Sequence, residues 1–156
     1  MTAGSGLSDG SPWWRLLFRL FYRFLRLVDP LIRIYWRARL PGLARVVDLE
    51  TIGRRSGRPR QILVTLLSGD GRRYIGHPNG SAVWTRNLEA AGEAIVRDPT
   101  GAPTAVRAVR LEPGPVRDAV VRSAWSQQPF PANLVYWLAR DHVRAVGLYF
   151  RLEDRL

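Results

Sequence analysis

The first part of the chain alternates apolar residues with single arginines at a helical spacing. Between residues 13 and 28, long apolar side chains cover most of a helix circumference, and arginine recurs at positions 15, 19, 23 and 26, a spacing that gathers these arginines into one stripe. Ser11 followed by Pro12 is typical of a helix start, and Pro30 is expected to break or kink the helix. We therefore predict an amphipathic basic-aromatic helical segment over residues 11–42, preceded by disordered residues 1–10.

From residue 43 onward the pattern changes to short apolar runs separated by turn residues. Gly69-Asp70-Gly71 between two such runs predicts a tight hairpin turn, and Ser81 is a candidate N-cap. Many strands in close succession with few crossover helices favour a mostly antiparallel barrel over a doubly wound sheet. We predict one domain over residues 43–156. Its expected strands are 44–51, 58–67, 72–76, 93–97, 104–111 and 144–152, and its expected helices are 81–91, 113–125 and 133–140.

The charge balance points to an anionic partner. All 24 basic residues are arginine, and 13 acidic residues leave a formal net charge of +11. A GC-rich genome explains arginine in place of lysine, whereas the excess of base over acid indicates a phosphate-bearing cofactor, an anionic bilayer or nucleic acid. The absence of cysteine excludes disulfides, thiolate metal sites and thiol nucleophiles. The two histidines show no ligand-like spacing with carboxylates, so no metal site is predicted.

The basic-aromatic segment is typical of an interfacial helix. Its longest uncharged apolar stretch is three residues, which is too short to span a membrane, and its internal arginines argue against a signal peptide. A helix packed on the barrel or in a dimer interface is the alternative. The membrane interpretation predicts a cytoplasmic protein peripheral on the inner face of the cell membrane. Its contact residues would be Trp13, Trp14, Arg15, Phe18, Arg19, Phe21 and Arg23.

A second basic segment joins two predicted strands. Residues 49–60 contain four arginines within eight positions, together with Gly53 and Gly57, which let the backbone turn closely. Backbone N–H groups, the Ser56 hydroxyl and guanidinium forks would form a cradle for phosphate or polycarboxylate. A solvated basic hairpin or a nucleic-acid contact is the alternative. No nucleic-acid-binding motif accompanies the charge, so nucleic acid is not a predicted partner.

This segment resembles the Thr-Thr-Gly-Arg-Arg/Lys-Ser/Thr-Gly-x-x-Arg motif of the deazaflavin (F420)-dependent nitroreductase family. A second stretch, Gly-His-Pro-Asn-Gly at 76–80 followed by Trp-Thr-Arg-Asn-Leu at 84–88, is similar to the family's glycine-rich loop and Trp-x-x-Asn-Leu helix. The matches cover residues 49–60 and 76–91. The resemblance implies a split β-barrel of the FMN-binding type with flanking helices (α+β), coenzyme F420 as cofactor with FMN as second choice, and a homodimer.

The resemblance also implies a cofactor site in two parts, with a substrate pocket beside it. The phosphate and acidic tail of the cofactor would be held by Arg54, Arg55, Ser56, Gly57, Arg58 and Arg60. The deazaflavin ring would lie near His77, Asn79 and Gly80, with Trp84 and Asn87 fixing the loop from the helix, where Asn87 is expected to bond backbone. An aromatic wall of Phe130, Tyr136 and Trp137 would line the substrate pocket.

The implied activity is hydride transfer from reduced deazaflavin to a quinone, nitroaromatic or unsaturated lipophilic acceptor at the membrane surface. The cofactor carries such a reaction, and the protein positions the reactants. Tyr136 is the candidate proton donor, with solvent as an equal alternative. Related branches of the superfamily bind lipids such as fatty acids. A membrane-associated lipid-binding protein of the same fold without redox activity is therefore the alternative.

Overall fold

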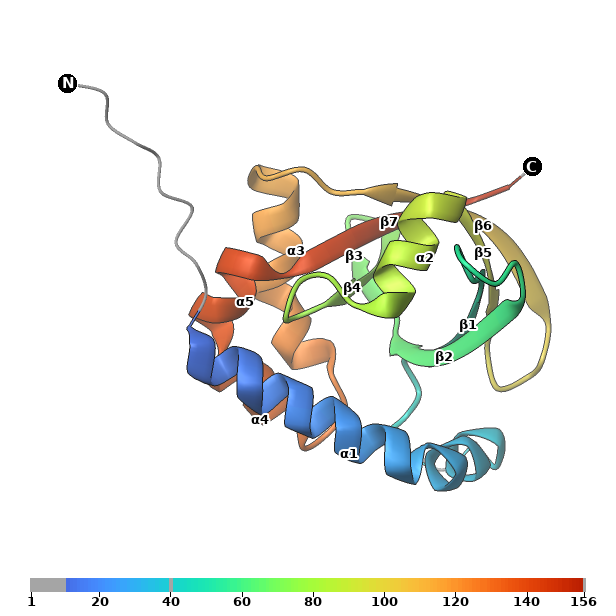
Figure 1. Ribbon diagram of the computed structural model, residues 1–156, viewed down its shortest axis with the longest axis horizontal. Helices are drawn as coiled ribbons and strands as arrows, with labels where there is room; N and C mark the ends of the chain where they lie inside the picture. Colours follow the sequence, from blue (N-terminus) through green and yellow to red (C-terminus); the bar gives the residue numbers. More distant parts are fainter. Residues whose placement is uncertain (1–10, 40, 156) are drawn as a thin grey trace.

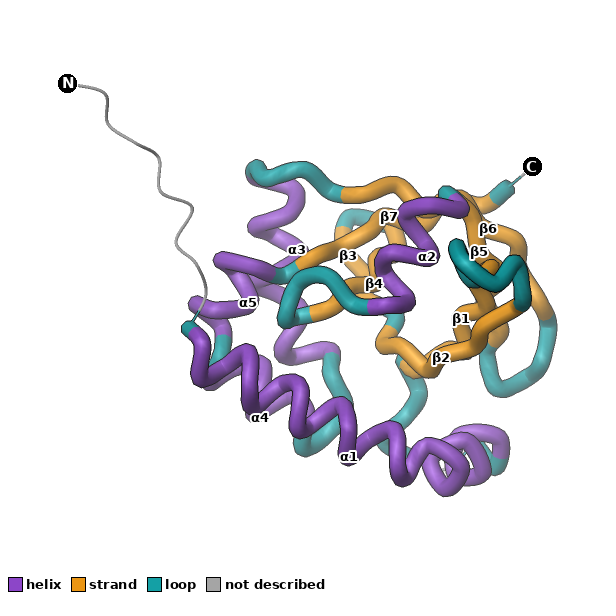
Figure 2. The backbone as a smooth tube through the Cα atoms, viewed as in Figure 1, coloured by secondary structure: helices purple, strands orange, loops and turns teal. Residues whose placement is uncertain are grey.

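The protein is built around one curled, antiparallel seven-stranded sheet (Figures 1 and 2). The computed structural model describes residues 11–39 and 41–155, so the prediction for residues 1–10 lies outside it. The strands are β1 Val46–Ile52, β2 Pro59–Thr65, β3 Leu67–Gly69, β4 Arg72–His77, β5 Glu93–Arg97, β6 Pro103–Arg110 and β7 Leu148–Asp154. They lie in the order β2-β1-β5-β6-β7-β4-β3, and neighbouring strands are antiparallel. The predicted mostly antiparallel arrangement is confirmed.

Five helices accompany the sheet in the described part of the chain. They are α1 Pro12–Arg37, α2 Val83–Ala91, α3 Pro115–Gln127, α4 Ala132–Leu138 and α5 Arg140–Val146. Of the two outcomes predicted for Pro30, a break or a kink, the break is absent, because α1 continues through this residue, and the last turns of the helix bend in Figure 1. The N-cap of α2 is Ala82 and not Ser81. Residues 144–146 belong to α5 and not to the last strand, since His142 and Val143 are buried on a helical face.

Two clusters of buried side chains hold these elements together. One lies between the curled strands and α2 and includes Leu49, Ile75 and Leu88, all fully buried. The other joins the sheet to the helices and contains Phe18 of α1, which has no exposed surface. Burying a side chain of this size stabilises a fold by about 1.5–3 kcal/mol. The inner face of α1 is therefore part of the core.

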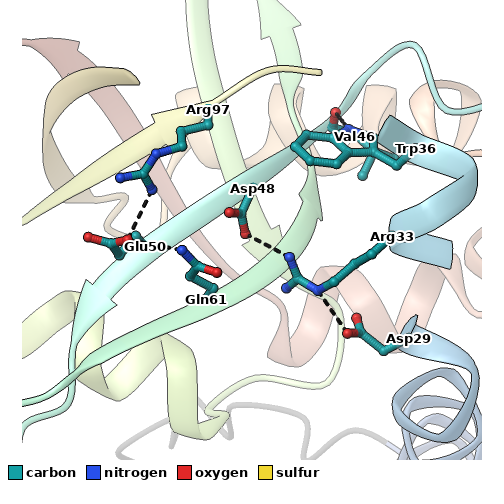
Figure 3. Close-up of polar contacts among 8 residues, drawn as sticks. All are labelled: Asp29, Arg33, Trp36, Val46, Asp48, Glu50, Gln61 and Arg97. Carbon is teal, nitrogen blue, oxygen red and sulfur yellow. Dashed lines mark hydrogen bonds and ion pairs between the residues drawn. The ribbon is translucent and has the colours of Figure 1, made fainter. Parts of the chain in front are cut away.

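The last turns of α1 are also fastened to β1 by polar contacts (Figure 3). Arg33 Nε lies 2.8 Å from Asp29 Oδ2, and its Nη1 lies 3.3 Å from Asp48 Oδ1. Burial opposes the charge of Arg33, but the hydrogen bonds and charges of the two carboxylates more than offset it and raise its pKa. The indole N–H of Trp36 donates to the carbonyl of Val46 at 2.7 Å. These contacts hold the helix on both sides of Pro30.

Candidate functional site

The loop between β1 and β2, residues 53–58, is a tight closed turn. The Gly53 N–H donates to the Arg58 carbonyl and the Gly57 N–H donates to the Gly53 carbonyl, both at 2.8 Å. A Cβ atom on Gly53 would lie 2.5 Å from Ser56 Oγ, and Gly57 has a φ of +65°. Both positions therefore favour glycine, and the shape of the loop follows directly from the local sequence.

The loop is supported by α2 and by its own serine. Asn87 is buried, and its Oδ1 accepts a hydrogen bond from the Arg54 N–H at 3.2 Å. Asn87 thus bonds backbone, as its motif position predicts. The Ser56 hydroxyl accepts a hydrogen bond from the Arg58 N–H at 3.3 Å. Ser56 therefore shapes the turn from within.

The electrostatics of this loop are one-sided. Arg54, Arg55, Arg58 and Arg60 are exposed, and none of them forms an ion pair with any residue that the structure describes. The one carboxylate of the motif, Glu50, is held elsewhere (Figure 3).

Glu50 is engaged across the neighbouring strands. Its Oε2 accepts hydrogen bonds from Gln61 at 3.1 Å and from Arg97 at 3.0 Å, and these contacts lower its pKa. The loop arginines are thus left without an internal counter-charge in the described structure. Guanidinium groups in this state bind phosphate and carboxylate groups through paired hydrogen bonds.

The second predicted part of the site, the loop after β4, is covered by α1. The ring of Tyr22 lies 4.7 Å from the ring of His77, measured between centroids. Asn79 Nδ2 donates to the Arg15 carbonyl at 3.3 Å, and Asn79 Oδ1 lies 2.9 Å from His142 Nε2. The side-chain amide of Asn79 is thus engaged inside the protein. This half of the site is closed, whereas the arginine loop is open.

Burial perturbs the titratable groups beneath α1. Desolvation lowers the pKa of His77 to about 4. The pKa of His142 is lowered by burial and by the charge of Arg15. Both imidazoles are therefore neutral at pH 7. The Trp84 ring lies 6.3 Å from the His77 ring, between centroids, in an edge-on arrangement. A Cβ atom on Gly80 would lie 3.0 Å from the Val146 carbonyl oxygen.

The three aromatic residues expected to line a substrate pocket lie in different surroundings. Tyr136 is buried, its hydroxyl lies 3.1 Å from that of Tyr22, and its ring meets Phe18 edge-on at 5.9 Å. Phe130 and Trp137 are 77% and 44% exposed, so the three side chains do not line one enclosed space. Burial raises the pKa of Tyr136 well above its ordinary value, which disfavours an ionised Tyr136 at neutral pH.

The sequence analysis missed the part that α1 and α5 play in covering the β4 loop. Tyr22, Arg15 and His142 each contact predicted site residues from more than fifty positions away in the chain. No local motif pairs such distant positions. A cavity of about 250 Å³ lies elsewhere, between residues 42–46 and 126–129, and contains none of the predicted site residues.

Comparison with known proteins shows the fold and no closer relationship. No family model matches this chain, and no curated protein matches it. The solved structures with a similar fold include HutZ, the heme storage protein of Vibrio cholerae. Its TM-score is 0.54 at 16% identity, over 83% of this chain and 91% of HutZ.

Two further structures have the same fold. An F420-H2-dependent reductase has a TM-score of 0.52 at 22% identity, over 70% of this chain and 94% of the reductase. A domain-swapped dimer has a TM-score of 0.51 at 19% identity, over 81% of this chain and 96% of that one. These similarities confirm the predicted split β-barrel with flanking helices. A reductase and a heme storage protein share this fold, so the fold alone does not identify the ligand.

Proposed function

We propose that this protein binds a phosphate-bearing deazaflavin of the F420 type through the β1–β2 loop and acts as an F420-dependent reductase. The observation that carries the proposal is the glycine-shaped turn with four exposed arginines that lack an acidic partner among the described residues. The fold shared with an F420-H2-dependent reductase supports it. When bound, a reduced deazaflavin supplies the hydride, so the chain needs no nucleophile of its own.

The residues of the loop fit the acidic end of such a cofactor. Arg55 and Arg58 on the turn and Arg60 at the start of β2 offer exposed guanidinium groups. Hydrogen bonds to charged groups contribute about 1.5–3 kcal/mol each. At the ring end, Tyr22 and Arg15 must withdraw before a planar ring can lie against His77 and Asn79. The chain would then hold the cofactor, orient the acceptor and exclude water.

We place this reaction at an anionic membrane surface, with a quinone, nitroaromatic or unsaturated lipid as the acceptor. The support is the outward face of α1, where Leu27 is 82% exposed and Arg19 and Arg23 are also exposed. Trp14 and Phe18, which were predicted as membrane contacts, instead pack into the core on the inner side of α1. Among the described helices, none is long and apolar enough to cross a membrane. With the exposed apolar side chains of α1 on the membrane, a lipophilic acceptor would reach the protein from the bilayer surface.

A fluorescence titration of the purified protein with F420 tests the proposal, with FMN and hemin as rival ligands. Arg55→Ala and Arg60→Ala should each weaken F420 binding about tenfold, because each removes a charge-assisted hydrogen bond. Arg122→Ala is the matched control, since it removes an equally exposed arginine from α3. Equal affinity in all four proteins would contradict the loop as the binding site, and tighter binding of hemin or FMN would replace the proposed cofactor.

A second candidate is lipid binding without redox activity. The observation that favours it is the closed ring half, where the Tyr22 ring lies against His77 and the Asn79 side chain is bonded on both sides. A protein of this kind should release fatty acid on organic extraction and bind fatty acid equally well with Arg55→Ala. Extraction without recovered lipid, together with F420 binding, would exclude it.

A further inference from the structure

The outer face of α1 and the exposed edge of α4 carry large apolar side chains on neighbouring helices. On α1 they are Trp13, Leu16, Leu20, Phe24, Leu27, Leu31 and Ile34, between 47% and 82% exposed. On α4 and the turn before it they are Phe130, Leu134, Trp137 and Leu138, between 44% and 77% exposed. We call these eleven residues the two-helix surface.

The two helices are in direct contact through Tyr136 of α4 and the inner face of α1. Tyr136 of α4 is hydrogen-bonded to Tyr22 of α1 and packs against Phe18. Figure 1 shows both helices along the same edge of the molecule, with the sheet on the other side of them. Exposed apolar groups gathered in this way are characteristic of a surface that contacts another phase or another molecule.

The charges beside this surface select its partner. Arg19, Arg26 and Arg37 are exposed. With a rotation of about 100° per residue, they lie about 100° around the helix axis from Leu20 and Leu27, which mark the apolar face. The one described acidic residue of α1, Asp29, is paired with Arg33. The apolar face of α1 is thus flanked by unopposed positive charge.

The α4 edge has the same character. The helix contains no charged residue, and the guanidinium of Arg140 that follows it lies 4.9 Å from the Trp137 ring centroid. Asp141, next in the chain, is exposed as well. Tryptophan with arginine against it is typical of residues that lie in the headgroup region of a bilayer.

A second copy of the chain fits this charge pattern poorly. An antiparallel pair of α1 helices related by a twofold axis would place both arginine stripes on the same side of the contact, where they repel. A surface of anionic lipid instead pairs with the arginines while the apolar side chains enter the acyl boundary. The net charge of +11 acts in the same direction.

We propose that the two-helix surface docks on an anionic bilayer, with α4 inserted beside α1. This inference rests on the membrane placement proposed above and adds α4 as an equal contributor. It also gives Phe130 and Trp137 a role in lipid contact in place of an enclosed substrate pocket. The bound protein would lie with α1 parallel to the membrane, between the bilayer and the β4 loop.

Vesicle flotation of the full chain tests the proposal with phosphatidylglycerol and with phosphatidylcholine. The intact protein should float with phosphatidylglycerol and much less with phosphatidylcholine. The double variants Leu27→Ser/Leu31→Ser and Trp137→Ser/Leu138→Ser should each weaken partitioning about tenfold or more, since each withdraws two large apolar groups. Val83→Ser, which removes a 61% exposed apolar residue from α2, is the matched control.

Three results would overturn the proposal. If the α4 variant floats as well as the intact protein, α4 does not contact the membrane. If both double variants float as well as the intact protein, the two-helix surface is not the membrane contact. A dimer in sedimentation equilibrium that becomes a monomer in these variants would make the surface a contact between copies. F420 titration of the same variants separates this proposal from the proposed function, because cofactor binding at the arginine loop should stay intact when flotation is lost.

Discussion

The two halves of the candidate site differ in what shapes them. The β1–β2 loop is open and positively charged, and its geometry depends on glycines and hydrogen bonds within six residues. The β4 loop is closed and uncharged at neutral pH, and its surroundings come from α1 and α5. The comparison teaches that an exposed, positively charged turn can be built from a few consecutive residues, whereas an aromatic enclosure needs side chains from distant parts of the chain.

The largest expected effect comes from opening the closed half. Phe18→Ala should destabilise the protein by about 3–5 kcal/mol, because it removes a fully buried aromatic side chain from the core under α1. Leu27→Ala on the outer face should change stability by less than about 0.5 kcal/mol, since Leu27 is 82% exposed. Urea unfolding measures both. Equal midpoints for the two variants would show that the inner face of α1 contributes no more than the outer one.

The closed half should also make stability depend on pH. Burial depresses the pKa of His77 from 6.5 to about 4, so the unfolded chain binds a proton more readily than the folded one. The contribution of neutral His77 to the free energy of unfolding is therefore complete above pH 6.5. It is lost as the pH falls toward 4, by roughly 3 kcal/mol in total.

Unfolding midpoints measured across this pH range check the sign of the effect. His77→Gln should make the decline between pH 6.5 and 4 shallower, because it removes one of the two buried histidines whose pKa is lowered. Arg55→Ala should leave this pH dependence unchanged, because Arg55 is an exposed residue of the open half and does not contact His77. If the unfolding midpoint changes with pH equally in the intact protein and in His77→Gln, the assignment of this pH dependence to His77 is wrong.

The smallest effect is expected in the open half. Asn87→Ala should cost about 1–2 kcal/mol, because it leaves the Arg54 N–H without its acceptor. Hydrogen exchange should then show faster loss of the Arg54 amide proton, and F420 binding should weaken with the loosened loop. Asn133→Ala is the control, since Asn133 bonds the backbone of its own neighbour. If the Arg54 amide exchanges equally fast in both variants, α2 does not hold the loop.

Much of the fold follows from local patterns. Strand β5 has the predicted bounds, and the hairpin at Gly69-Asp70-Gly71 forms with positive φ at Asp70 and Gly71. Strand β3 was missed because it has three residues and follows β2 after a single position. The helix α5 was missed because it has seven residues and is separated from the strand that follows by a single position. Short elements carry too little periodicity to be told apart by pattern alone.

For the site, the sequence by itself determined the arginine-rich turn, its two glycines and the contact of Asn87 with backbone, because these depend on residues close together in one motif. It also predicted that residues 11–42 carry more apolar surface than the fold can bury, which the exposed outer face of α1 confirms. Only the tertiary structure decided which face of α1 turns inward, and so placed Tyr22 over His77 and the Arg15 carbonyl against Asn79. The physical reason is that a helix apolar nearly all round has no single preferred face, and shape complementarity with α4, α5 and the sheet makes the choice.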